Sequence, residues 1–349
     1  MNADKTMTDI TPLNTLVSQI KTMMTQARSA VAQEVNAYNL KTYWEIGRII
    51  VEYEQKGNVK AQYGTQLLKD LSKRLIDDIG RGFSVSNLQF MRRFFLEYPI
   101  QQTLSVKLSW SHYCELLIIS DKDKRAFYEQ ECQNASWSVR ELKRQIETSL
   151  FERLLLSDGS TNKETVLVLS REGITMSKPE DILREPYVFE FLGVREQKPI
   201  LEKDLEKRLI RHIEDFLLEL GRGFMFVGSQ QRVTLGNTHY YVDMVFYNKI
   251  LKAYVLIDLK MGHLKPEDIG QMNMYLNYYN TEVNDKDDQK PIGIVLCADK
   301  HDVMAEYALG GLENTIFASR YVYYIPDKEQ LINEVKSLLE QDTEDQSAD

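Results

Sequence analysis

Tyr240-Tyr-Val-Asp-Met-Val-Phe-Tyr-Asn248 and Ala253-Tyr-Val-Leu-Ile-Asp-Leu-Lys260 are two neighbouring stretches with the length and apolar content of buried strands. Each is interrupted by charge. A carboxylate left unpaired among apolar side chains costs several kcal/mol, so Asp243 and Asp258 need a compensating partner. The spacing of Asp258 and Lys260 places both side chains on one face of a strand. Two adjacent strands are therefore expected to offer two carboxylates and one ammonium.

This triplet has the chemistry of a phosphodiesterase. Hard cations such as Mg²⁺ take oxygen ligands, and a bound cation both lowers the pKa of water and neutralises a phosphate oxygen. A lysine beside the carboxylates stabilises charge that develops on phosphorus. The residues predict phosphodiester hydrolysis with Mg²⁺ or Mn²⁺ as cofactor, by a site that contains Asp243, Asp258 and Lys260. The alternative is a buried ion pair in a structural sheet.

Helices are expected before and after these two strands in the sequence. In the helix over residues 201–220, Glu206 points into the apolar sector. Glu202 falls in the same sector but lies at the frayed start of the helix, so Glu206 is the better candidate. A second helix begins at Pro266 and reaches about residue 280, with Gln271 and Tyr275 as neighbours on one face. Further strands are predicted at 224–228, 231–236, 291–297 and 321–325. The order of helix, strands, helix and strands indicates an α/β domain.

The N-terminal part has helical periodicity. Helices are predicted from Leu13 to Gln55, over 63–77, over 87–97 after a capping box at Ser86, and from Ser138 to about residue 156. Residues 157–163 contain turn formers and no apolar residue, which indicates a linker. We therefore expect a mainly helical domain over 10–156, an α/β domain over 164–335 with a strand at 165–169, and a disordered acidic tail over 337–349.

Polar and basic residues lie along one edge of the predicted 87–97 helix. Gln89, Arg92 and Arg93 stand beside apolar positions after a glycine-containing turn. Such an edge can form a recognition helix in the major groove of DNA. An ordinary solvated face of a packing helix is an equal alternative.

Composition sets limits on the class of protein. The 349 residues carry a formal net charge of −9, with +3 in residues 1–150 and −12 in the remainder. No apolar run approaches the ~20 residues of a membrane span, and the N-terminus lacks the pattern of a secretion signal. We therefore expect a cytoplasmic protein with no membrane partner. The widely separated Cys114, Cys132 and Cys297 suggest neither a disulfide framework nor a zinc site.

The order of the charged residues resembles a known signature. Asp243, then Asp258-Leu-Lys260, then Gln271-Met-Asn-Met-Tyr275, is similar to the PD-(D/E)xK nuclease motif with its QxxxY extension. The whole sequence resembles the YhcG-type family. The stretches that carry this wider resemblance are 108–113, 137–142, 221–228 and 305–309. One departure is Val242, which stands where the motif has proline.

The resemblance implies a restriction-endonuclease-like C-terminal domain and a winged-helix-like N-terminal domain. It implies that Asp243, Asp258 and Glu206 bind the metal, that Lys260 is the catalytic cation and that Gln271 orients a ligand or phosphate. Gln230 and Tyr275 would contact nucleic acid. DNA is the expected partner, in repair, recombination or defence against foreign DNA, with a homodimer and partner proteins of such a system as further expectations. An RNA nuclease, or a catalytically silent binding subunit of a larger assembly, remains the alternative.

Overall fold

The chain divides into two compact units. The computed structural model describes residues 10–55, 61–98, 105–157, 162–184, 186–194, 201–299, 315–325 and 328–345. Unit 1 comprises Met1–Arg125 and Ser136–Leu142, and unit 2 comprises Ala126–Ala135 and Lys143–Asp349.

Unit 1 is built from helices. Its elements are α1 (Ile10–Tyr53), α2 (Ala61–Asp78), α3 (Val85–Glu97), α4 (Trp110–Leu116) and the first residues of α5 (Lys122–Ala135) and α6 (Val139–Glu147). Its core contains Ile50 from α1, Leu68 from α2, and Leu88 and Met91 from α3. The mainly helical expectation is confirmed. Within 10–55, 61–98 and 105–125 no strand is present, so the described part of unit 1 contains no β-hairpin of the kind that forms a wing.

Helix capping corrects one predicted boundary and confirms another. Ser84, not Ser86, caps α3, because its hydroxyl accepts a hydrogen bond from Asn87 N at 3.2 Å and the helix begins at Val85. Ser138 caps α6 as predicted, accepting from Glu141 N at 3.2 Å. The helix that begins there ends at residue 147, however, because Ser149 takes a left-handed conformation with φ 53° and α7 (Leu150–Ser157) starts anew.

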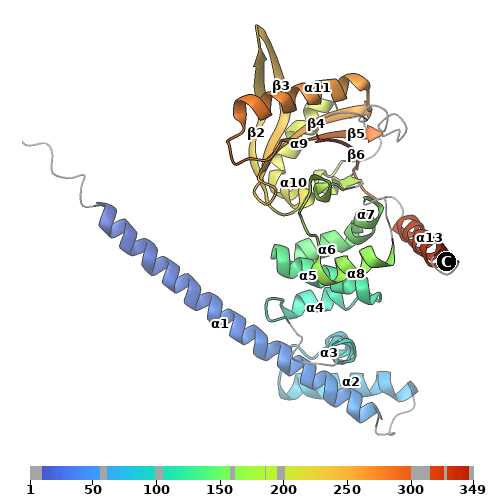
Figure 1. Cartoon of the computed structure of the whole chain (residues 1–349). Helices are drawn as coiled ribbons and strands as arrows, with labels where there is room; N and C mark the ends of the chain where they lie inside the picture. The colour runs from blue at the N-terminus through green and yellow to red at the C-terminus, as the bar shows by residue number, and fades with distance from the viewer. Residues whose placement is uncertain are drawn as a thin grey trace, which may run out of the picture. The chain divides into compact units, whose positions relative to one another are not determined.

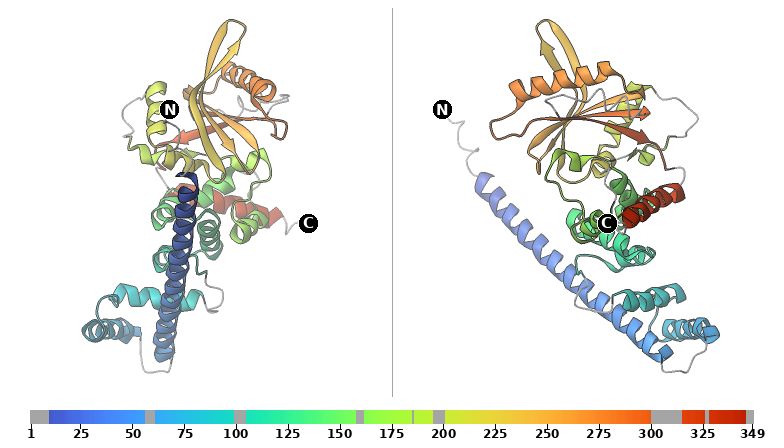
Figure 2. Two further views of the ribbon diagram at one scale, coloured as in Figure 1. Left: turned by 90° about the vertical axis from the view of Figure 1, so that its left-hand side faces the viewer. Right: turned by 45° about the vertical axis from the view of Figure 1, so that its right-hand side comes forward.

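Unit 2 combines a sheet with covering helices (Figures 1 and 2). After α7 its elements are α8 (Lys163–Glu172), η3 (Pro179–Ile182), β1 (Tyr187–Val188), η4 (Glu190–Leu192), α9 (Glu202–Arg211), α10 (Ile213–Leu220), β2 (Phe224–Leu235), β3 (Thr238–Asn248), β4 (Ala253–His263), α11 (Pro266–Tyr278), η5 (Tyr279–Val283), β5 (Ile292–Asp299), β6 (Thr315–Val322) and α13 (Lys328–Asp345). The α/β expectation is confirmed. The two strands predicted at 224–228 and 231–236 are one strand with a bulge beside Val227, and the helix predicted over 201–220 is divided at His212.

The sheet is mixed, with strand order β1-β6-β5-β4-β3-β2. The strands β2, β3 and β4 pair antiparallel, while β4, β5, β6 and β1 pair parallel. One face buries Phe246 and Ile257 against Leu209 and Phe216 of α9 and α10. The other buries Leu256 against the side chains of α11. Because both faces are covered, β4 and β5 are continuous apolar runs in which a charged residue is conspicuous.

A buried ionic cluster of Arg144, Arg153, Glu190 and Glu219 connects residues 143–157 to the rest of unit 2. The Glu219 carboxylate, which is 1% exposed, lies 2.6 Å from Arg153 Nη1 and 3.0 Å from Arg144 Nη2. Val188 N of β1 donates to it at 2.9 Å. The linker expected at 157–163 therefore falls inside unit 2, whose contacts begin before it. Sequence composition marks a polar loop but does not reveal such a cluster.

Two further expectations differ from the structure. Residues 165–169 are helical in α8, because the Asn162 side chain caps the helix by accepting from Thr165 N at 2.8 Å. This local cap overrides the strand preference of the Thr-Val-Leu-Val-Leu run. The acidic segment expected to be disordered from Ser337 is helical as far as Asp345 in α13, which buries Val335. Residues 346–349 lie outside the described part of the chain.

Across the described residues, no helix is both long enough and apolar enough to cross a membrane.

Candidate active site

Asp243 lies where β3 separates from β4. The two strands pair from Asn248 and Ala253 as far as Met244 and Ile257. Beyond this point β3 continues into a hairpin with β2, while β4 continues beside β5. Leu259 N of β4 consequently donates to Asp243 Oδ2, at 2.9 Å, instead of to a strand carbonyl. The point where β3 and β4 separate is here called the fork of the sheet. At the fork, a backbone hydrogen bond fixes the Asp243 carboxylate.

Asp258 and Lys260 extend from the same face of β4, as the spacing predicts. The side chain of Asp258 is 4% exposed, and its Oδ2 atom lies 2.7 Å from Lys260 Nζ. The two side chains therefore form a close ion pair. Burial, followed by the charge of Asp243, raises the pKa of Asp258 to about 7, although Lys260 opposes the shift. The two carboxylates are therefore close enough to repel each other.

Lys260 remains a cation in this setting. Burial by itself lowers its pKa, but neighbouring carboxylates reverse the effect and raise it above its ordinary value. Asp258 contributes most, and Glu202 and Asp268 add to it. Asp268 Oδ1 lies 3.8 Å from Lys260 Nζ, while Asp268 Oδ2 accepts from Lys265 N at the start of α11. A fixed positive charge thus stands beside the two acids.

Glu206 and Gln230 adjoin the carboxylates from the side of α9 and β2. Gln230 Nε2 donates to Asp243 Oδ1 at 3.2 Å. Burial raises the pKa of Glu206, which is 7% exposed; a hydrogen bond with Gln230 lowers that pKa, and the charge of Asp243 raises it. Gln230 has φ 49°, an uncommon conformation for a residue with a side chain. This local strain aims the amide at the two acids.

Gln271 and Tyr275 brace the site from α11. Gln271 Nε2 donates to Tyr275 Oη at 2.7 Å, and the buried Tyr275 hydroxyl donates to the carbonyl of Tyr241 at 3.0 Å. The QxxxY spacing thus forms one hydrogen-bonded chain from α11 to β3, two residues before Asp243. These contacts hold the fork of the sheet in place.

The structure brings five of the predicted site residues into one network: Glu206, Gln230, Asp243, Asp258 and Lys260. The predicted nucleic-acid residues of α3 belong to unit 1. There Arg92 Nε lies 2.7 Å from Glu54 Oε2, while Gln89 is exposed and Arg93 is half-buried. The ion pair with Glu54 occupies part of the hydrogen-bonding capacity of Arg92.

Sequence reasoning passed over two acids of the site. Nothing in the sequence marks Asp268 as a site residue, because its approach to Lys260 depends on how α11 packs on β4. Glu202 was set aside for its place at a helix end, yet its charge acts on Lys260 and it hydrogen-bonds the backbone of Met261. A helix-wheel argument could have kept Glu202, but only the packing identifies Asp268.

The donor set fits a hard divalent cation. Asp243 and Asp258 supply carboxylate oxygens, each with lone pairs beyond those already engaged. No cluster of three or more His, Cys, Asp or Glu ligands occurs in the part of the chain that the structure describes, so it holds no ready-made cage. Mg²⁺ is suited to such a site because it is bound through one or two carboxylates and keeps waters or substrate phosphates as its other ligands.

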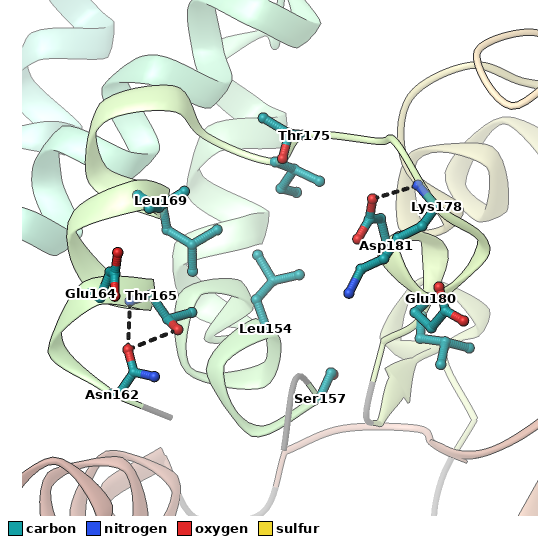
Figure 3. A pocket seen from close by; sticks show the side chains of 13 residues that line it. Leu154, Ser157, Asn162, Glu164, Thr165, Leu169, Thr175, Lys178, Glu180 and Asp181 are labelled. Atoms are coloured by element: carbon teal, nitrogen blue, oxygen red, sulfur yellow. Dashed lines mark hydrogen bonds between the residues drawn. The ribbon is translucent and has the colours of Figure 1, made fainter. Parts of the chain in front are cut away.

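A separate pocket of unit 2 lies among α7, α8 and η3 (Figure 3). Its polar side chains serve local structure: Asn162 caps α8, and Asp181 accepts from Lys178 N at 2.9 Å. None of Asp243, Asp258 or Lys260 lines it. The carboxylate network is therefore the stronger candidate for chemistry.

Comparisons with known proteins agree with this geometry. Residues 180–338 match the family model described as "YhcG PDDEXK nuclease domain", and residues 19–153 match "DUF1016 N-terminal domain". The chain is 41% identical over 345 residues to "Putative nuclease YhcG" of Escherichia coli (strain K12), which covers 90% of this chain and 91% of that protein. The chain belongs to the YhcG family of PD-(D/E)xK nucleases. The nuclease match includes all five networked residues and the Gln271–Tyr275 pair.

Two solved structures overlap with part of this YhcG-family chain. The "crystal structure of a repair endonuclease from Pyrococcus abyssi" is 15% identical, covers 36% of this chain and 49% of its own, and has a TM-score of 0.26. The "Structure of EndoMS-dsDNA2 complex" is 14% identical, covers 38% of this chain and 51% of its own, and has a TM-score of 0.25. The overlap spans about half of each solved chain, and similarity this low says nothing about substrate.

Proposed function

We propose that this YhcG-family chain hydrolyses phosphodiester bonds of DNA with Mg²⁺ or Mn²⁺ as cofactor. The observation that carries the proposal is the incomplete neutralisation of two adjacent carboxylates. Burial and the charge of Asp243 together raise the pKa of Asp258 to about 7, even though Lys260 lies 2.7 Å away. A divalent cation supplies the positive charge that this pair lacks.

Asp243 and Asp258 would hold the cation, with Glu206 as a further acid nearby. When bound, the cation lowers the pKa of water and neutralises a phosphate oxygen. The sheet supports this role because Leu259 N and Gln230 Nε2 fix both oxygens of Asp243 in advance. A site arranged before substrate arrives has little reorganisation left to do during the reaction.

Lys260 would act on the phosphate itself. Its ammonium is half-buried, so its field is screened less than that of a surface lysine. The carboxylates around it keep it protonated, which suits a group that stabilises negative charge on the phosphate oxygens. Gln271 and Tyr275 would act indirectly, by holding the β3 backbone beside Asp243.

Unit 1 and the wider assembly belong to the same proposal. The Gln89, Arg92 and Arg93 edge of α3 would bring DNA or a partner protein to the nuclease. One such site cuts one strand, so cleavage of both strands together calls for a homodimer or for two successive cuts. DNA repair, recombination and defence against foreign DNA are the settings that suit such an activity.

The decisive experiment is cleavage of single-stranded, duplex, branched and plasmid DNA, and of RNA, with Mg²⁺, Mn²⁺ or EDTA. We expect cation-dependent cutting of DNA by the native chain. Lys260→Met should reduce the rate by about 10²- to 10³-fold, because it removes a preorganised charge. Asp258→Asn should also abolish cutting. Lys249→Met and Asp287→Asn, at exposed positions outside the site, should cut like the native chain.

Other outcomes would support one of the alternative functions, an RNA nuclease or a binding subunit without catalysis. Cutting of RNA in preference to every DNA substrate would make the chain an RNA nuclease. Binding of DNA without cutting by the native chain, unchanged in Lys260→Met, would favour a binding subunit that lacks catalysis. Cutting that survives both Asp258→Asn and Lys260→Met would remove the site from the mechanism.

A further inference from the structure

The β2–β3 hairpin projects beyond the rest of the sheet (Figures 1 and 2). Its last pairs are Arg232 with Tyr241, Val233 with Tyr240, Thr234 with His239, and Leu235 with Thr238. β4 pairs with β3 only from Met244 onward, so this part of the hairpin extends past the fork that holds Asp243. The base of the hairpin positions Asp243, whereas its outer pairs extend beyond the part of the sheet that β4 reaches.

The two faces of the projecting hairpin differ in character. Val233 and Val242 are fully buried and pack in the cluster that includes α11. Alternate residues point to opposite faces, so the other face carries Arg232, Thr234, His239 and Tyr241, here called the outer face. Tyr241 is 49% exposed, and Arg232 and His239 are exposed as well.

The outer face begins at the candidate active site. Gln230 and Asp243 stand opposite each other one step closer to the sheet, and their side chains are hydrogen-bonded at 3.2 Å. Two residues advance a strand by about 7 Å, so Tyr241 and then His239 follow Asp243 outward at about 7 and 14 Å. The outer face thus forms a strip that leads directly away from the carboxylates.

Two contacts anchor the outer face. The carbonyl of Tyr241 accepts from the Tyr275 hydroxyl at 3.0 Å, which fixes this residue to α11. Thr234 Oγ1 lies 3.0 Å from His239 Nδ1 across the hairpin. A backbone that is ordered before binding loses little conformational entropy on contact with a ligand. The outer face thus presents the exposed Tyr241 and Arg232 side chains on a hairpin whose backbone is anchored to α11.

We propose that the outer face binds the nucleotides of a single DNA strand next to the cleaved phosphate, with Tyr241 stacked on an unpaired base and Arg232 bound to a phosphate. This inference rests on the proposed nuclease function. Exposed aromatic rings bind single strands because every base offers a π-face, whereas a duplex hides these faces. Arginine suits the neighbouring phosphate through its paired donors. The substrate class is DNA with unpaired nucleotides beside the cut.

Binding measurements on full-length protein test the strip. The Asp258→Asn chain would be titrated with a dye-labelled single-stranded oligonucleotide and with a blunt duplex, followed by fluorescence anisotropy. Adding Tyr241→Ala should weaken single-strand binding about tenfold, and Tyr241→Phe should retain it, because stacking needs only the ring. Adding Arg232→Ala should weaken binding and reduce the slope of log K against log salt by about 0.7.

Matched controls separate this strip from a general surface effect. Tyr38→Ala removes a tyrosine that is 65% exposed on α1 of unit 1, and Arg171→Ala removes an exposed arginine of α8. Both should bind like the parent. Thermal melting of each variant excludes unfolding, since Tyr241 and Arg232 face solvent and their removal should leave the transition within a few degrees of that of the parent.

The inference fails if Tyr241→Ala and Arg232→Ala bind the single strand as tightly as the parent. It also fails if they weaken only duplex binding, which would indicate docking in a DNA groove. In either case, cation-dependent cutting that Lys260→Met reduces by about 10²- to 10³-fold would leave the proposed nuclease function standing. If the native chain neither cuts nor binds any nucleic acid, both proposals fall together.

Discussion

Asp258 and Glu219 are both carboxylates of unit 2 that are almost completely buried beside a cation. Asp258 lies 2.7 Å from Lys260, and Glu219 lies 2.6 Å from Arg153. Their pKa values nevertheless move in opposite directions. Burial and Asp243 raise the pKa of Asp258 to about 7. Burial also acts to raise the pKa of Glu219, but Arg153 and Arg144 outweigh it, and the pKa falls below its ordinary value.

The two pKa values differ because the carboxylates have different numbers of charged neighbours, and because these neighbours differ in sign. Glu219 meets two guanidinium groups and Val188 N, so its buried charge is fully compensated. Asp258 has one ammonium and a second carboxylate, so its charge is not. A buried charge that its neighbours compensate usually has a structural role. A buried charge that they do not compensate is typical of a site where a bound ligand supplies the missing opposite charge. The comparison supports a structural role for Glu219 and is consistent with the proposed role of Asp258 in binding a cation.

The largest expected effect comes from breaking the compensated site. Glu219→Gln removes the anion that Arg153 and Arg144 share, although Arg144 keeps its ion pair with Glu190. Removal of one partner of a buried pair costs about 3–5 kcal/mol of the free energy of unfolding. Urea unfolding at neutral pH measures this loss. Glu214→Gln, at an exposed position of the same helix, should change stability by no more than about 0.5 kcal/mol.

Asp258→Asn is the reverse case. It removes a buried charge that faces another carboxylate, so we expect the variant without divalent cation to be at least as stable as the native chain. A loss as large as that of Glu219→Gln would contradict the distinction drawn between the two carboxylates.

A smaller effect on stability is expected when a divalent cation binds beside Asp258 and compensates its charge. Mn²⁺ at 100 times its dissociation constant should raise the free energy of unfolding of the native chain by about 2.7 kcal/mol, because it binds only the folded form. Asp258→Asn should lose this gain, and Asp204→Asn, exposed on α9, should keep it. Urea unfolding with and without Mn²⁺ provides the comparison. Equal gains in all three proteins would place the cation elsewhere.

The nuclease fold could largely be predicted from the sequence. Apolar runs of strand length, such as that around Asp258, are buried on both sides, and this makes an acid within them conspicuous. The helix periodicity around Glu206 points that side chain inward, and the structure buries it. Residues that are adjacent on a strand or one turn apart on a helix are brought together by local geometry alone.

The rest depends on contacts between distant residues. Asp268 approaches Lys260 only because α11 packs on β4, and Glu219 reaches Arg144 and Arg153 only because α6 and α7 join unit 2. The spacing of these residues in the sequence carries no such information. The same limit explains the linker expected at 157–163: a polar loop is visible in the composition, but the ionic cluster that sets the unit boundary before it is not.

The smallest expected effect is the pH dependence of the Glu219 contribution. Unfolded glutamate has a pKa of about 4.3, and the folded value of Glu219 lies below it, so the native state binds its proton less readily than the unfolded state does. The stability that this shift contributes is present above about pH 4.3 and is lost as pH falls through the folded pKa. The difference in free energy of unfolding between the native chain and Glu219→Gln should therefore stay constant from pH 7 to about pH 5 and shrink below that. Acids outside the cluster titrate equally in both proteins and cancel in the difference. Glu190 is the exception, because burial and the charge of Glu219 both raise its pKa. A difference that grows as the solution is acidified would show that the cluster raises the pKa of Glu219, and the contrast with Asp258 would disappear.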